Sequence, residues 1–245
     1  AGLLHLWWWS RYGRFRTLNF LVLNNLQNES DKYEKLEKFT KQLTKLYLIY
    51  SLLYQESINE INGSFTNQLT QLIVNDSFNS VMQHITDKIN QHYDWKKKRL
   101  TEIISGDILY SSKVKNILCR LSALLEENTN STQPNDIRSL KKNLFWNALD
   151  IEHIQSFNDE NIEERDRIKS EWGENLNSLG NLVVLEQNIN RSINNVMSKK
   201  LDGYKKSSLT IVKDKLTEQY SDWNLEKCIC RKNYEVNKII KYLME

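Results

Sequence analysis

The sequence has little proline, glycine or cysteine. One proline and seven glycines among 245 residues argue against collagen-like and low-complexity chains. The three cysteines, Cys119, Cys228 and Cys230, are odd in number and have no C-x-x-C spacing, so neither a disulfide framework nor a zinc ribbon is indicated. The apolar stretch near the start, Gly2 to Trp9, is far too short to cross a bilayer. We therefore expect a soluble, cytoplasmic protein without a membrane segment.

A large excess of charge of one sign is also lacking. Lysine and arginine total 34 against 31 acidic residues, and this net charge of +3 does not by itself imply nucleic acid or an anionic membrane as partner. The basic residues are concentrated locally. The segment from Gln187 to Lys213 contains six basic residues and one acidic residue, Asp202, whereas the segment from Asp150 to Glu186 is strongly acidic. The later segment is the one expected to face phosphate groups.

The first half of the sequence shows helical periodicity in most of its length. Apolar residues recur at intervals of three and four over residues 31–53, 65–74, 78–89 and 112–127. The turn-rich stretch Asn128 to Asp136 contains the only proline and is interpreted as a linker. This predicts a helical domain over residues 1–136. Its tryptophan-rich start, Trp7 to Trp9, indicates either a surface where an absent upstream domain docks or a buried helix.

The pattern changes over residues 137–245. Ala148 to Ile154 and Asn181 to Leu185 are strand candidates, and Ser192 to Leu201 is a short helix candidate. Two further helices are expected, from Ser207 to about Tyr220 and from Asn224 to Leu243. The predicted fold class is mainly α with a small α+β part.

Chemistry is indicated most clearly at one of the four histidines. His153 lies in the pentapeptide Asp150 to Ile154, where the period of a strand places the carboxylates of Asp150 and Glu152 on one face, with the imidazole next to them near the strand end. Carboxylates beside a histidine suit a divalent metal and a general base. The alternative is an ordinary surface histidine between acids.

Two segments together resemble a known family. His153 with Ile154, then Gly180-Asn181-Leu182, then asparagines four residues apart and a lysine follow the order of an HNH, or ββα-metal, nuclease. Specifically, the stretch from Asp150 to Ser208 resembles the C-terminal domain of GmrSD-type modification-dependent restriction enzymes. In that comparison the matching residues are His153, Asn181, Asn190, Asn194 and Lys200. The chain departs from the family at Gln155-Ser156, where members have an apolar residue and a proline, and at Glu152, where many have aspartate.

The resemblance implies a one-metal phosphodiesterase. In it His153 would deprotonate a water, Asn181 would orient the histidine loop, and Mg²⁺ or Mn²⁺ would be held by Asp150 or Glu152 together with Asn190. DNA is the implied partner, contacted by Arg191, Asn194, Lys199, Lys200, Lys205 and Lys206. A second basic run, Trp95 to Arg99, either extends this contact or is a solvated helix face.

The function implied is a metal-dependent DNA endonuclease that nicks DNA or cuts both strands, in bacterial defence against phage or modified DNA. The resemblance also implies an upstream ParB-like nucleotide-hydrolysing domain or subunit that is absent from this sequence. Two rival interpretations stay open. One is a catalytically inactive nuclease-like module that binds DNA or a partner, and the other is a helical assembly protein in which the histidine is incidental.

Overall fold

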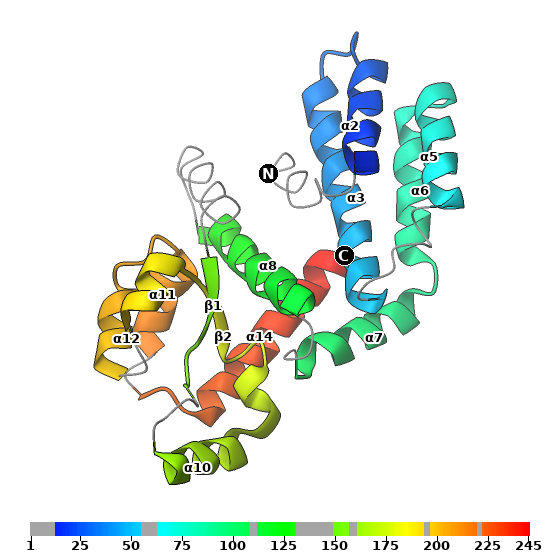
Figure 1. Cartoon of the computed structure of the whole chain (residues 1–245). Coiled ribbons are helices and arrows are strands. Elements are labelled where there is room, and N and C mark those ends of the chain that lie inside the picture. Colours follow the sequence, from blue (N-terminus) through cyan, green and yellow to red (C-terminus); the bar gives the residue numbers. More distant parts are fainter. Residues whose placement is uncertain are drawn as a thin grey trace. The chain divides into compact units, whose positions relative to one another are not determined.

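A computed structural model describes residues 13–54, 63–107, 112–130, 149–156, 161–193, 197–219 and 222–245. The chain divides into two compact units, Ala1–Leu100 with Tyr242–Glu245, and Thr101–Lys241 (Figure 1). The predicted domain boundary at residue 136 and the tryptophans Trp7 to Trp9 lie outside the described residues. Because the units divide after Leu100, the helix that follows residue 111 belongs to the second unit.

The first unit is helical. Its elements are α2 (Gly13–Asn25), α3 (Lys32–Tyr54), α5 (Ser64–Asn75), α6 (Phe78–Asn90) and most of α7 (Tyr93–Ser105). The predicted apolar periodicities over residues 31–53, 65–74 and 78–89 are confirmed by α3, α5 and α6. Every residue from Leu46 to Leu52 is buried, so this stretch of α3 is enclosed on all sides. Since α3 packs against α2 and α6, it forms the core of this unit.

The second unit combines helices with one small sheet. Its elements in chain order are α8 (Ser112–Asn130), β1 (Leu149–His153), α10 (Ile162–Trp172), η1 (Gly173–Asn177), β2 (Leu182–Glu186), α11 (Gln187–Ile193), α12 (Met197–Tyr204), η2 (Ile211–Leu216), α13 (Thr217–Gln219) and α14 (Leu225–Met244), whose last turn lies in the first unit. The predicted fold class, mainly α with a small α+β part, is confirmed.

The sheet consists of β1 and β2 paired antiparallel, with Leu149 opposite Glu186 and His153 opposite Leu182. The four apolar residues from Leu182 to Leu185 are all buried, because α8 packs on β2 and α11 packs on both strands. Figure 1 shows the two strands with α11 and α12 on one side and α8 and α14 on the other. The sheet therefore sits inside the second unit, with helices on both sides.

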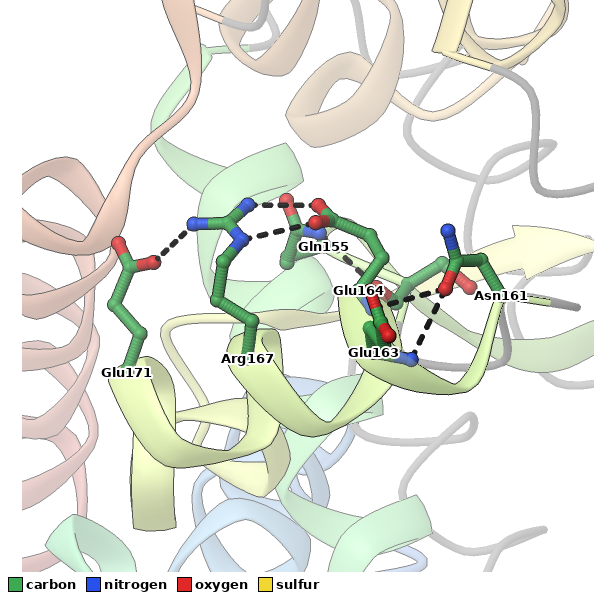
Figure 2. A network of polar contacts seen from close by, with 7 residues as sticks. Gln155, Asn161, Glu163, Glu164, Arg167 and Glu171 are labelled. Atoms are coloured by element: carbon green, nitrogen blue, oxygen red, sulfur yellow. Dashed lines mark hydrogen bonds and ion pairs between the residues drawn. The ribbon is translucent and has the colours of Figure 1, made fainter.

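The connection between the strands contains α10, which the sequence analysis did not predict. Asn161 caps this helix by accepting from the backbone N–H groups of Glu163 and Glu164, at 3.0 and 3.3 Å. Figure 2 shows Arg167 bridging the exposed carboxylates of Glu164 and Glu171. Exposed pairs of this kind contribute little to stability, because solvent screens them. The cap and the amphipathic burial of the helix therefore matter more than these ion pairs.

All described residues of the predicted helix from Ser192 to Leu201 are helical, but they belong to two helices, and residues 194–196 lie outside the described residues. Helix α11 starts directly after β2 and ends at Ile193, and α12 starts at Met197. The two helices pack so closely that a Cβ atom on Gly203 would lie 2.1 Å from Cγ2 of Ile193. The predicted helix after Ser207 is a π-helical segment, η2, followed by the short α13. Of the described helices, none is long and apolar enough to span a membrane.

Candidate active site

Strand β1 presents its polar side chains in two directions. Asp150 and Glu152 lie on the face covered by α11 and α12, because their partners are on those helices. His153, the last residue of the strand, bonds instead to Asn177 of η1. This agrees with the alternation of side chains along a strand. The imidazole is thus adjacent to the carboxylates in sequence, but contacts a different part of the unit.

Asp150 is held by two neutral amides. Nε2 of Gln187 donates to its Oδ1 at 3.4 Å, and Nδ2 of Asn190 donates to its Oδ2 at 3.3 Å. Gln187 and Asn190 are three residues apart in α11, so both point to the same side of that helix. The structure therefore brings together one predicted metal-binding carboxylate and the predicted amide, which are 40 residues apart in the chain.

Glu152 is paired with a buried cation. Nζ of Lys200 lies 2.6 Å from Oε1 of Glu152, and the two side chains are 3% and 12% exposed. The hydroxyl of Tyr204 donates to the same oxygen at 3.1 Å. Lys200 also donates to the carbonyl oxygens of His153 and Ile154 at 2.6 and 3.3 Å. Lys200 therefore fixes the end of β1 and is buried, which corrects the expectation that it contacts DNA.

The ring of His153 contacts an asparagine. Its Nε2 lies 3.2 Å from Oδ1 of Asn177, and because an amide oxygen can only accept, this contact fits the tautomer that carries its proton on Nε2. Burial lowers the pKa of His153, the bond to Asn177 opposes this, and the positive charges of Lys115 and Lys200 lower it further. A neutral imidazole with a lone pair on Nδ1 is suited to general-base chemistry.

Asn181 fixes the chain just after the histidine. It is fully buried; its Oδ1 accepts from the N–H of Gln155 at 2.7 Å, and its Nδ2 donates to the carbonyls of Gln155 and Leu176 at 3.1 and 2.9 Å. These bonds connect the segment that follows β1 with the turn that precedes β2. The amide thus holds the segment after His153, the place where the chain departs from the family pattern.

The predicted DNA-binding residues are placed differently from one another. Arg191 on α11, with Lys205 and Lys206 after α12, is exposed. Lys205 lies 3.9 Å from Asp202, a distance at which an exposed pair is weak. Asn194 and the side chain of Lys199 lie outside the described residues. The exposed cations of this predicted set therefore lie on α11 and directly after α12.

Three residues of the site were missed by the sequence analysis. Asn177 was one asparagine among many, and nothing in its position marks it. Gln187 could have been found from its spacing of three residues from Asn190, but only if α11 had been predicted in that place. Tyr204 matched no motif whose chemistry was recognised. Each depends on the packing of η1, α11 or α12 against β1.

The chain was also compared with known proteins. Residues 97–234, more than half of the chain, match the family described as the C-terminal domain of GmrSD restriction endonucleases. No curated protein and no solved structure matches the chain. The matched range contains both strands and every residue of the site described above.

Proposed function

This chain belongs to the family of GmrSD restriction endonuclease C-terminal domains, and on that premise we propose that it is a metal-dependent DNA endonuclease of the HNH type. A restriction-endonuclease-like nuclease role follows from the family itself. The observation that carries the finer proposal is the contact between Asn190 and Asp150 at 3.3 Å, two residues before the Glu152 that pairs with Lys200. It brings a carboxylate and an amide together, and in the sequence this carboxylate is three residues before His153, whose ring contacts Asn177.

The residues present fit Mg²⁺ or Mn²⁺. Carboxylate and amide oxygens are hard ligands, and Mg²⁺ is commonly held by only one or two carboxylates, with waters and substrate phosphate completing its shell. Among the described residues, no group of three or more His, Cys, Asp and Glu side chains is arranged to hold a metal ion, so a site here would use one carboxylate and an amide. Asp150 and Asn190 are therefore the proposed ligands, once the Asn190 amide turns its oxygen toward the cation.

We choose Asp150 over Glu152 as the ligand because of their partners. Among the described residues, the two partners of Asp150 are neutral amides that a cation can displace. Glu152 already has the ammonium of Lys200 within 2.6 Å in an environment with little solvent. Placing a second cation on Glu152 would bring two positive charges together in a buried place.

In the proposed reaction, Nδ1 of His153 takes a proton from the water that attacks the phosphorus of a DNA phosphate. Asn177 keeps the proton on Nε2 and so fixes the ring, while Asn181 holds the chain that follows it. The bound cation would stabilise the charge on the phosphate and on the departing 3′ oxygen. Arg191, Lys205 and Lys206 would supply the salt-sensitive, sequence-independent attraction to the phosphate backbone.

The family resemblance supports two further parts of the proposal. One is a role in bacterial defence against phage or modified DNA. The other is action together with an upstream ParB-like nucleotide-hydrolysing domain or subunit. Neither depends on the residues of the site.

Cleavage of supercoiled plasmid tests the proposal. We expect nicked or linear product with Mg²⁺ or Mn²⁺ and none with a chelator. His153→Ala should lower the rate by about 10²–10⁴-fold, the contribution of a general base. His92→Asn is the matched control, because His92 is an exposed histidine with a positive φ of 57° that asparagine tolerates.

Cleavage that survives His153→Ala would overturn the proposed role of this histidine. An intact plasmid combined with salt-dependent DNA binding would identify the chain as an inactive nuclease-like binding module instead.

A further inference from the structure

A cavity of about 490 Å³ lies in the second unit, among side chains of α8, η2, α13 and α14. Its size falls within the range of about 300–1,000 Å³ that is usual for small-molecule sites. The lining residues that matter here are Glu126, Lys215, Lys227, Cys230, Arg231 and Tyr234. None of them is a proposed metal ligand or a proposed base, so the nuclease proposal leaves this cavity without a function.

The floor of the cavity is an ion-pair network. The carboxylate of Glu126 is buried and bonds to the ammonium groups of both Lys215 and Lys238. Lys238 also lies 2.8 Å from the buried carboxylate of Glu235, which accepts from the hydroxyl of Ser122 at 2.5 Å. The two carboxylates are thus matched by two lysines within the network.

Further cations lie at the rim. Lys227 is a partly exposed lysine whose ammonium pairs with the exposed Asp222. Arg231 uses Nη1 for its bonds to backbone carbonyls, so Nη2 and Nε can still donate to a ligand. Because the floor is balanced and Lys227 is paired with Asp222, the excess positive charge at the mouth of the cavity is that of Arg231. A negatively charged ligand suits this mouth.

The rim also carries an aromatic ring. Tyr234 is 53% exposed, and the ammonium groups of Lys215 and Lys238 lie 5.9 and 5.1 Å from its ring centroid. An exposed ring among cations is the combination that stacks a base while phosphate is held beside it. The neighbouring wall is apolar, formed by Ile211 and Leu216 at the two ends of η2. Such π-helical segments frequently occur at functional sites.

We propose that this cavity binds a nucleotide, with its base against Tyr234 and its phosphate toward Lys227 and Arg231. The cavity is separate from the proposed nuclease centre, but its lining residue Arg231 contacts the turn that supports this centre. Nη1 of Arg231 donates to the carbonyls of Leu179, Gly180 and Leu182 at 2.9, 2.6 and 3.1 Å. These carbonyls flank Asn181, so a nucleotide in the cavity would contact the side chain that braces the turn behind His153.

Cys230 provides a built-in reporter of occupancy. It is exposed and lines the cavity, whereas Cys119 and Cys228 are buried. Burial raises the pKa of Cys119 to about 12 and also raises the pKa of Cys228, so both thiols should react slowly. The rate at which a thiol reagent labels Cys230 in the full chain, measured by peptide mass spectrometry, therefore reports on the cavity alone.

The probes are deoxyadenosine monophosphate, a single-stranded deoxyadenosine tetranucleotide, deoxyadenosine and inorganic phosphate. At ten times its dissociation constant, a nucleotide that covers Cys230 should slow labelling about tenfold. We expect much weaker protection from deoxyadenosine or phosphate, because each supplies only half of the contacts. Stronger protection by the tetranucleotide would assign the site to an unstacked base within DNA, and stronger protection by the monophosphate would assign it to a free nucleotide.

Four variants sharpen the test. Tyr234→Ala should abolish protection, Tyr234→Phe should keep it, and Lys227→Ala should weaken it. Lys241→Ala, an exposed lysine of the same helix outside the cavity lining, is the matched control and should leave protection unchanged. Absence of protection by both nucleotide probes, or equal protection in wild type and Tyr234→Ala, would overturn the proposal. Because no cleavage is measured, this failure is distinguishable from failure of the nuclease proposal.

Discussion

Asp150 and Glu152 lie two residues apart on the same face of β1, yet their surroundings differ in charge. Helix α11 offers Asp150 two neutral amides, whereas α12 offers Glu152 the buried ammonium of Lys200. We therefore propose two roles for the same functional group, set by the helix that covers it. A carboxylate paired with neutral donors keeps its attraction for a metal cation, while one paired with a buried lysine serves to hold the strand.

The largest effect expected from this difference is on cleavage. Asp150→Asn should lower the cleavage rate by about 1,000-fold, because a catalytic metal contributes several kcal/mol and each 1.4 kcal/mol is tenfold. Glu152→Gln should cost only about tenfold, as expected of a group that supports the site from outside. Plasmid cleavage under single-turnover conditions measures both rates. Equal losses in the two variants would remove the distinction between the carboxylates.

The losses of stability in these two variants should follow the reverse order. Glu152→Gln should lower the free energy of unfolding by about 3–5 kcal/mol, because it leaves the buried ammonium of Lys200 without its counter-charge. Asp150→Asn should cost about 1 kcal/mol or less, since only bonds to neutral amides change. Urea denaturation monitored by circular dichroism gives both values. Lys200→Met should resemble Glu152→Gln, and Lys205→Met, at an exposed lysine, is its control.

A smaller loss is expected at the turn behind the histidine. Asn181→Ala removes three hydrogen bonds and leaves the N–H of Gln155 without the partner that Asn181 provides, so it should cost about 1–3 kcal/mol of stability. Asn161→Ala, which removes an exposed helix cap, is a comparison in which about 1 kcal/mol is expected. The same urea experiment compares the two. A loss at Asn181 no larger than at Asn161 would contradict its assigned role in bracing the loop.

The smallest effect is a shift in pH dependence. Burial lowers the pKa of His153 below its ordinary value of 6.5, so the neutral base predominates at pH 7 and the cleavage rate should fall only in more acidic solution. The bond to Asn177 raises this pKa, so Asn177→Ala should move the acidic limb further toward low pH. The pH–rate profiles of wild type and Asn177→Ala locate the acidic limb of each protein. A rate that still climbs steeply between about pH 7 and 8 would contradict the neutral assignment of His153.

Much of this fold was predictable because it follows from local patterns. Apolar periodicity located α3, α5, α6 and α8, and the apolar run that starts at Leu182 located β2. The assignment of this predicted helix to two helices was not predictable, because they pack together through Gly203 and Ile193, which is a tertiary contact. The same holds for α10, whose charged sequence carries only two buried residues, Ile168 and Trp172.

The site was predictable in its motif residues and not in their surroundings. Asp150, His153, Asn181 and Asn190 could be named from spacing and resemblance. The burial of Lys200 could not, since the carbonyls it binds lie at the end of β1 and just after it, far away in the sequence. Lys96 shows the same effect in the first unit, where it is buried and donates to carbonyls at the end of α6, so only part of the basic run after Trp95 can face a nucleic acid.

The choice between Asp150 and Glu152 as metal ligand is tested most directly by Mn²⁺ binding, followed by electron paramagnetic resonance of the free ion. Wild type and Glu152→Gln should bind one Mn²⁺ with similar affinity, and Asp150→Asn should lose that binding. Loss of the ion in Glu152→Gln with retention in Asp150→Asn would contradict the account, because the cation would then be held by the carboxylate that Lys200 neutralises.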